Sequence, residues 1–209
     1  MAMRVVVNNG PGKKRSGSTS RALKPAQPQI VLRAAVAADA LALLELIAAH
    51  LEEGRLLPRT LDELTVHAPR FVVAVEQRAD IRQGEDASAG RSDRIVGCAE
   101  LAPLSANVAE IRSLVVSRAA RNTGVGNRMV EALAIRARHE GFTRLCAFAH
   151  DPAFFVRRGF SIVPHTWVPE KIAHDCTSCP LFRNCGQFAI VMDIDRTAES
   201  TLRRSMAHV

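Results

Sequence analysis

Apolar and polar positions along the chain form patterns typical of strands and of helices in alternation. Strand patterns, rich in Val, Ile and Leu, cover residues 30–35, 71–75, 94–101, 108–116, 144–149, 161–163 and 188–194. Helical patterns cover residues 39–51, 60–66, 124–139 and 152–158. This order, β-α-α-β-β-β-α-β-α-β-β, predicts an α/β fold in which helices flank a single mixed, mostly antiparallel sheet.

The chain of 209 residues suits one domain with a tail at each end. Residues 1–28 are rich in Gly, Ser, Pro and basic residues and are expected to be disordered, and residues 197–209 form a C-terminal tail. The domain is expected over 29–196, with an exposed loop at 78–93 and a cysteine-bearing insertion at 171–186. No apolar run approaches the roughly 18 residues of a membrane span. The N-terminal residues also lack a secretory pattern, so a cytoplasmic location is expected.

The net charge of +7 would suggest a nucleic-acid-binding protein if it were spread over the fold. Residues 1–28, however, contain six basic residues and no acidic one, which leaves the remainder nearly neutral. A near-neutral domain without interleaved aromatics argues against a basic, metal-containing nucleic-acid-binding module, which is the alternative outside the enzymes. The tail fits either a solvated leader or a weak anion-binding segment.

A glycine-containing loop follows the strand that ends in Leu114-Val115-Val116 and opens the longest predicted helix. The loop is Arg121-Asn122-Thr123-Gly124-Val125-Gly126. Its two glycines would let the backbone approach a ligand closely, and the N–H groups at the helix start would point outward together, which suits a phosphate. The third glycine of a dinucleotide fingerprint and the Gly-Lys-Ser/Thr of a nucleotide-hydrolase loop are both missing. Gly-x-Gly alone is also compatible with a plain turn.

With these residues the chain resembles the Gcn5-related N-acetyltransferase superfamily. The resemblance is carried by Arg121-x-x-Gly124-x-Gly126, by the strand before it and by Phe154-Phe155-x-x-x-Gly159-Phe160, and it covers about residues 31–194. It implies that the co-substrate is acetyl-CoA, whose pyrophosphate is held by the loop N–H groups. It also implies that the strand before the loop binds the pantetheine and the acetyl carbonyl. The cofactor-binding residues implied by the resemblance are Leu114, Val115, Val116, Arg121, Asn122, Thr123, Gly124, Val125 and Gly126.

Three further segments resemble the short, single-domain bacterial N-acetylglutamate synthases, which are amino-acid N-acetyltransferases. They are Gly54-Arg55-Leu56-Leu57-Pro58-Arg59-Thr60, Glu110-Ile111-Arg112-Ser113-Leu114 and Glu170-Lys171-Ile172-x-x-Asp175-Cys176-x-x-Cys179-Pro180. This resemblance implies transfer of acetyl to the amino group of L-glutamate, the first step of arginine biosynthesis. The alternative among enzymes is an acetyltransferase for another small amine or for a protein N-terminus. No nucleic-acid or membrane partner is implied, and a homodimer is left open.

An acidic acceptor needs cations in its cleft. Arg59 and Arg112 are the candidates, and Ser113, beside Arg112 in the same segment, is the third expected substrate-binding residue. Arginine suits this task because its planar guanidinium binds a carboxylate through two parallel hydrogen bonds. With 24 arginines in the chain, either one is alternatively an ordinary surface residue.

Acetyl transfer also needs a group that takes a proton from the attacking ammonium. Glu110 is the first candidate for this catalytic base and Glu100 is the second. Glu110 and Arg112 share a strand face by the two-residue period, so an ion pair between them is the alternative. The chain has no Tyr, and Phe155 stands where many superfamily members carry the Tyr that reprotonates the thiolate. The thiolate is therefore expected to leave unassisted or to take its proton from water.

Three of the five cysteines form a cluster in the insertion: Cys176, Cys179 and Cys185. In a cytosolic chain this spacing favours a structural metal such as zinc over a disulfide, with His174 or His165 as a fourth ligand. A cluster of reduced thiols that closes the substrate side is the alternative. Cys98 and Cys146 fall in predicted strands and are expected to be core thiols.

Overall fold

The computed structural model describes residues 29–54, 56–77 and 94–194. The expected N-terminal and C-terminal tails, the loop at 78–93 and Arg55 lie outside the described residues. No helix in the described part of the chain is long and apolar enough to cross a membrane.

The described residues form strands and helices in the predicted order. The strands are β1 (Gln29–Ala34), β2 (Phe71–Gln77), β3 (Arg94–Pro103), β4 (Val108–Val116), β5 (Arg144–Ala149), β6 (Ser161–Val163) and β7 (Phe188–Asp193). The α-helices are α1 (Ala40–Ala48), α2 (Leu51–Gly54), α3 (Leu61–His67), α4 (Val125–His139), α5 (Ala153–Val156) and α6 (Pro169–Lys171). The short helical turns are η1 (Ala37–Asp39), η2 (Ala68–Arg70), η3 (Arg118–Ala120), η4 (His165–Trp167), the π-helical η5 (Ile172–Cys176) and η6 (Phe182–Asn184). The helix expected over 39–51 is thus divided into η1, α1 and α2.

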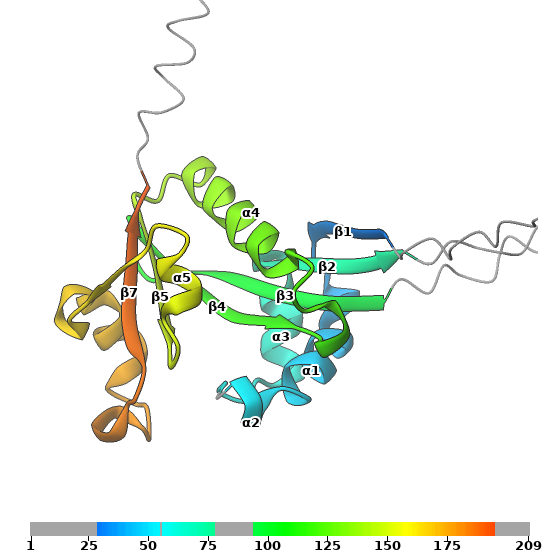
Figure 1. Ribbon diagram of the computed structural model, residues 1–209. Coiled ribbons are helices and arrows are strands. Elements are labelled where there is room, and N and C mark those ends of the chain that lie inside the picture. Colours follow the sequence, from blue (N-terminus) through cyan, green and yellow to red (C-terminus); the bar gives the residue numbers. More distant parts are fainter. Residues whose placement is uncertain (1–28, 55, 78–93, 195–209) are drawn as a thin grey trace, which may run out of the picture.

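One sheet runs through the molecule in the strand order β1-β2-β3-β4-β5-β7-β6. The pair β4 and β5 is parallel, and the other neighbouring strands of the described sheet are antiparallel. Figure 1 shows α4 on one side of this sheet and α1 to α3 on the other. The predicted fold class, a mixed and mostly antiparallel sheet flanked by helices, is confirmed.

The central strands are buried on both faces, and β2 shows how one strand serves both layers. Phe71 and Val73 pack with the helices α1 and α3, whereas Val72 and Ala74 belong to the core beneath α4. Successive side chains of a strand point to opposite faces, so a strand covered on both sides needs an apolar residue at every position. This explains why the strand patterns in the sequence lack a polar alternation.

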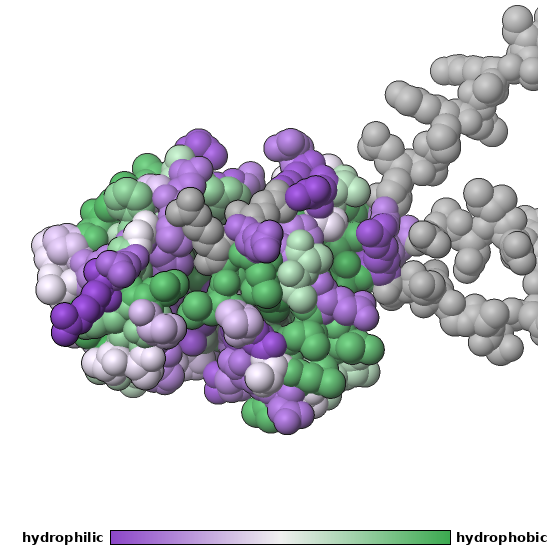
Figure 2. All heavy atoms as spheres, turned by 90° about the horizontal axis from the view of Figure 1, so that it is seen from below, coloured by the Kyte–Doolittle hydropathy of each residue, from purple (hydrophilic) through white to green (hydrophobic). Residues whose placement is uncertain are grey.

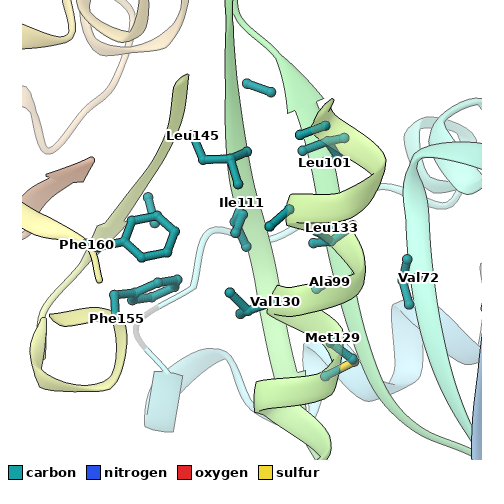
Figure 3. Close-up of a cluster of buried hydrophobic side chains, with 14 of the residues drawn as sticks. Val72, Ala99, Leu101, Ile111, Met129, Val130, Leu133, Leu145, Phe155 and Phe160 are labelled. Carbon is teal, nitrogen blue, oxygen red and sulfur yellow. The ribbon is translucent and has the colours of Figure 1, made fainter. Parts of the chain in front are cut away.

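Helix α4 forms the larger of the two layers on the sheet. Its residues Met129 and Leu133 are fully buried, and they lie over β3 and β4, where Leu101 and Ile111 face them (Figure 3). The core continues along β5 through Leu145 to the aromatic rings that follow α5. On the exterior, the face seen from below intermixes hydrophilic and hydrophobic side chains (Figure 2). Helix α4 therefore covers the sheet mainly over β2, β3 and β4.

Candidate active site

The strands β4 and β5 pair only over the first part of their length. Their register runs from Val108 opposite Arg144 to Ile111 opposite Ala147, and it ends there. β4 continues to Val116 and β5 to Ala149, so both strands extend beyond their last paired residues. Backbone groups that face this opening have no partner strand on that side. Such groups are available to bind an extended ligand.

A bulge in β4 lies just beyond the point where the strands separate. Cys98 and Glu100 of β3 pair with Val115 and Arg112 of β4, so two β4 residues oppose a single residue of β3. Ser113 has φ of 48°, a left-handed conformation that is uncommon for a residue other than glycine. A bulge bends a strand and redirects its side chains. Here it turns the second half of β4 away from β5.

A cavity of about 980 Å³ occupies the space between the separated strands. Besides β4, it is lined by the loop before α3, the first turn of α4, the end of β5 with His150, the helix α5 and the cysteine-bearing insertion. The expected site residues that line it are Arg59, Glu110, Arg112, Ser113, Leu114, Val116, Gly126 and Cys179. The structure thus brings the expected acceptor residues and one end of the glycine loop to the same space.

The glycine loop is shaped by two left-handed residues before α4 begins. Asn122 has φ of 62° and Gly124, the residue that caps α4, has φ of 83°. The first N–H groups of a helix have no partner within it, and α4 therefore presents a set of donors suited to an anion. At Gly126 an added Cβ would lie 3.4 Å from the ring of Phe154, so little space is left above this residue.

Four of the expected cofactor-binding residues have side chains that point elsewhere. Val115 is buried in the core beneath α1 and α3. Arg121 donates through Nε to the carbonyl oxygen of Val116 at 3.1 Å, which fastens the loop to the end of β4. Thr123 and Val125 line a second cavity, of about 390 Å³. The backbone N–H groups of Thr123 and Val125 are the parts of these two residues that could contact a phosphate at the start of α4.

Four charged side chains form one connected cluster at the base of the larger cavity, which we call the charged cluster: Glu110, Arg112, Lys171 and Asp175. Arg112 Nε donates to Glu110 Oε2 at 2.5 Å, and its Nη2 donates to Asp175. Lys171 Nζ lies 2.8 Å from both oxygens of Glu110 and 2.8 Å from Asp175 Oδ2. Two cations and two carboxylates thus join β4 to the insertion through α6 and the π-helical turn.

The pKa values of the cluster follow from these contacts. Burial disfavours the charged form of Arg112, but Glu110 and Asp175 outweigh it, so the pKa of Arg112 is raised. Burial alone would raise the pKa of Asp175, whereas hydrogen bonds from Lys171 and His174 hold it below its usual range. Both groups are therefore charged at neutral pH.

A second ion pair supports the cavity from the side of α3. Arg59 Nη1 donates to Glu100 Oε2 at 2.9 Å and to the hydroxyl of Ser113 at 3.1 Å, and Arg59 Nε lies 2.8 Å from Glu63 Oε1. Glu100 is 1% exposed and is not among the described residues that line the cavity. Glu100 is therefore poorly placed for the expected role of a second catalytic base. Arg59 holds the bulge of β4 at Ser113 in place.

A model of the acetyltransferase (GNAT) family matches residues 51–160, which include β2 to β5 and the glycine loop. The chain belongs to the GNAT family. This membership confirms the expected superfamily, and acetyl transfer is the activity of an enzyme of this family.

This acetyltransferase is similar to several known proteins. An uncharacterized N-acetyltransferase of Chlorobaculum tepidum is 29% identical over 160 residues, which are 77% of this chain and 94% of that protein. An amino-acid acetyltransferase of Mycobacterium tuberculosis is 30% identical over 79 residues, 38% of this chain and 45% of that protein. N-acetylglutamate synthase from Neisseria gonorrhoeae, complexed with coenzyme A and N-acetyl-glutamate, aligns at TM-score 0.65 and 26% identity over 81% of this chain. The chain spans only 36% of the length of that synthase.

Phe155 occupies a buried position beside the cavity of the acetyltransferase. Its ring meets those of Phe154 and Phe160 edge to face, with centroids 5.2 Å and 5.3 Å away, and Figure 3 shows it beside Phe160 in the core. The ring carries no hydroxyl, so this position supplies no proton to a leaving thiolate. The expectation that the thiolate leaves unassisted or takes its proton from water stays a prediction.

The cysteines of the insertion do not form the expected metal centre. Cys176, Cys179 and Cys185 are all free thiols, and among the described residues no group of three His, Cys, Asp or Glu side chains is arranged to hold a metal ion. The prediction of a structural zinc is therefore not supported, and no disulfide joins these three cysteines. Cys98 and Cys146 are buried core thiols, as expected.

Three residues that line the site received no role in it from the sequence: Lys171 and Asp175, which were named only within a resembling segment, and His150. Lys171 and Asp175 lie some sixty residues beyond Arg112, and only the fold brings them to β4. One sequence signal could have identified Lys171. It is the one lysine of the chain outside residues 1–28, in a protein that otherwise uses arginine as its cation.

Proposed function

We propose that this GNAT acetyltransferase transfers the acetyl group of acetyl-CoA to the amino group of L-glutamate. The observation that carries the proposal is that Arg112 and Lys171 meet in the same cavity that the end of the glycine loop reaches. The amino-acid acetyltransferase and the N-acetylglutamate synthase among the relatives support the same class of acceptor. L-Glutamate fits because it has two carboxylates to bind and one amine to acetylate.

The acetyl-CoA side of the proposal uses backbone groups. The N–H groups at the start of α4 would hold the pyrophosphate, since Gly124 and Gly126 leave the backbone accessible. The pantetheine would lie along the unpaired edge of β4 past the bulge at Ser113. The thioester would then reach the point where the two strands separate.

The acceptor side uses the charged cluster. Arg112 and Lys171 both donate to Asp175, so their donors already converge on a carboxylate of the protein itself. We propose that a carboxylate of L-glutamate takes the place of Asp175 between these cations. The two oxygens of Glu110 accept hydrogen bonds from both cations, and Glu110 would keep these contacts during the exchange.

Glu110 is accordingly assigned a positioning role rather than that of the catalytic base. Both of its oxygens already accept hydrogen bonds from cations, so they are engaged in holding Arg112 and Lys171. The alternative expected from the sequence, an ion pair between Glu110 and Arg112, is the arrangement that the structure contains.

A second candidate acceptor is another small amine without an acidic side chain. It is favoured by the four carboxylates in the lining of the cavity, Glu63, Glu110, Asp151 and Asp175, which outnumber its three arginine and lysine cations. A neutral or basic amine would bind without displacing Asp175. The two candidates therefore predict opposite preferences for charge on the acceptor.

The test is the rate of CoA release from acetyl-CoA with each of the twenty amino acids and several simple amines. L-Glutamate is expected to give the highest kcat/KM, with N-acetyl-L-glutamate identified as the product by mass spectrometry. A clear preference for a neutral or basic amine would favour the second candidate. If no amino acid releases CoA, the proposed function is wrong.

A further inference from the structure

His150 lies on the opposite wall of the cavity from the charged residues of β4. It is the third residue after Ala147, at which β5 leaves β4, just as Leu114 is the third residue after Ile111 on β4. Both His150 and Leu114 line the cavity. His150 thus follows β5 in the wall of the same cavity that Leu114 lines from β4.

The neutral imidazole has a defined tautomer at this position. Its Nδ1 lies 3.1 Å from the carbonyl oxygen of Gly186, the residue that closes the insertion. Because a carbonyl oxygen only accepts hydrogen bonds, Nδ1 carries the hydrogen, and Nε2 is the basic nitrogen of the ring. A backbone contact of this kind prepares a histidine to accept a proton at Nε2.

The other titratable groups around the imidazole are engaged in ways that suit them less to proton transfer. Across the cavity, Glu110 and Asp175 accept hydrogen bonds from Arg112 and Lys171. Next to the imidazole in sequence, the carboxylate of Asp151 accepts the backbone N–H of Ala153 at the start of α5.

Two further groups complete the titratable lining. Arg59 is paired with Glu63 on the side of α3. Cys179 contributes a thiol from the insertion. Among the described residues that line the cavity, His150 is the one histidine. Histidine is the residue used most often for general acid–base catalysis.

We propose that His150 is a catalytic residue that carries the proton of the acetyl transfer, an inference that rests on the proposed function. The neutral amine attacks the thioester carbonyl carbon, a C–N bond forms, and the nitrogen gives its proton to Nε2 of His150. The C–S bond then breaks, the electron pair leaves with the sulfur of CoA, and His150 returns the proton to that sulfur. The products are the N-acetylated amine and the free thiol of CoA. This role replaces the phenol that the chain lacks.

The experiment compares His150→Gln and His150→Ala with the wild-type chain, using the amine that the wild-type chain acetylates fastest. The choice of amine separates this inference from the proposed function, because a substrate other than L-glutamate contradicts the proposal but still allows the test. His139→Gln is the matched control, since His139 is an exposed residue at the end of α4. Unfolding temperatures are measured for every variant.

Both His150 variants are expected to lose about 100-fold or more in kcat with little change in the KM for acetyl-CoA. They should also lose the acidic limb of the pH profile of kcat. Added imidazole should restore part of the activity of His150→Ala and leave His139→Gln unaffected. A folded His150→Gln variant that retains the wild-type kcat and pH profile would overturn the inference. So would an activity loss in His150→Ala that imidazole does not reverse while His150→Gln remains fully active.

Discussion

The two halves of the cavity are built in different ways. The loop half reaches the cavity at Gly126, the last of the consecutive residues 121–126, whose backbone turns at Asn122 and Gly124 into the start of α4. The charged half combines side chains from β4 with Lys171 and Asp175, and ion pairs hold them together. A backbone site depends on local conformation, whereas a side-chain site depends on long-range packing. The two halves should therefore respond to mutation separately.

The largest expected effect comes from a substitution in the charged half, which should weaken the use of L-glutamate and not that of acetyl-CoA. Arg112→Ala removes a guanidinium that contacts two carboxylates in a partly buried cleft. Loss of such a charge-assisted pair costs roughly 2–5 kcal/mol. The kcat/KM for L-glutamate should fall at least about 30-fold, while the KM for acetyl-CoA measured at saturating L-glutamate stays within about twofold of the wild-type value.

Arg138→Ala is the matched control for this prediction, because Arg138 is an exposed arginine on α4. It should leave both kinetic parameters unchanged. Equal weakening of both substrates by Arg112→Ala, at an unchanged unfolding temperature, would show that Arg112 does not belong to the acceptor half.

The next largest effect is expected from a substitution in the loop half, which should weaken the binding of acetyl-CoA. Gly126→Val places branched carbons where a single Cβ already lies 3.4 Å from the ring of Phe154 and 3.7 Å from Val116. The bulk should raise the KM for acetyl-CoA about tenfold or more, because it lies where the backbone meets the pyrophosphate. Gly126→Ala is the graded control and should cost much less. The comparison of the two halves fails if Gly126→Val raises the KM for L-glutamate as strongly as that for acetyl-CoA.

A smaller effect concerns the pH dependence of the charged half. The pKa of Asp175 is lower in the folded chain than in the unfolded chain, so its carboxylate stabilises the fold above the usual aspartate value of about 3.9. This stabilisation is lost as the pH falls through the lowered pKa. The wild-type chain should therefore unfold a few degrees above Asp175→Asn at pH 7, and the difference should shrink progressively as the pH falls below the usual aspartate value. A difference that persists unchanged at low pH would exclude this electrostatic contribution.

The thiols provide the smallest expected effect. Burial raises the pKa of Cys98 to about 12 and raises that of Cys146 as well, whereas Cys185 is exposed. Ellman's reagent should label Cys185 first, and it should label Cys98 and Cys146 only after unfolding. A chelator should leave the unfolding temperature unchanged. Stoichiometric zinc in protein purified without an affinity tag would restore the metal prediction.

Most of the fold follows from local patterns, because each element carries its own signals. Helix α4 shows this best, since Met129 and Leu133 lie on its apolar face and glycines with positive φ stand at both ends, at 124 and 141. The helix expected over 39–51 fails at Ala49 and His50, where the apolar spacing continues although the backbone turns. Tertiary packing decides such a break, and the sequence pattern does not record it.

The site could be predicted only in part for the same physical reason. Arg112 and Gly126 could be identified as site residues because the sequence around each one, a strand pattern and a glycine loop, carries the signal. The bulge at Ser113 depends on the pairing of β4 with β3 and on the hydrogen bond from Arg59, neither of which is local. The contact of Lys171 with Glu110 likewise depends on how the insertion folds back onto β4. Spacing alone suggested zinc for the cysteines, but their arrangement in space does not support it.

The central claim is that the charged half selects an acidic acceptor, and the comparison of L-glutamate with L-glutamine tests it most directly. The two amino acids have nearly the same shape, and they differ in the charge that Arg112 and Lys171 would bind. The measurement is kcat/KM for each with saturating acetyl-CoA. We predict that L-glutamate exceeds L-glutamine by about tenfold or more, as expected for a charge-assisted contact. Equal values, or a preference for L-glutamine, would contradict the account.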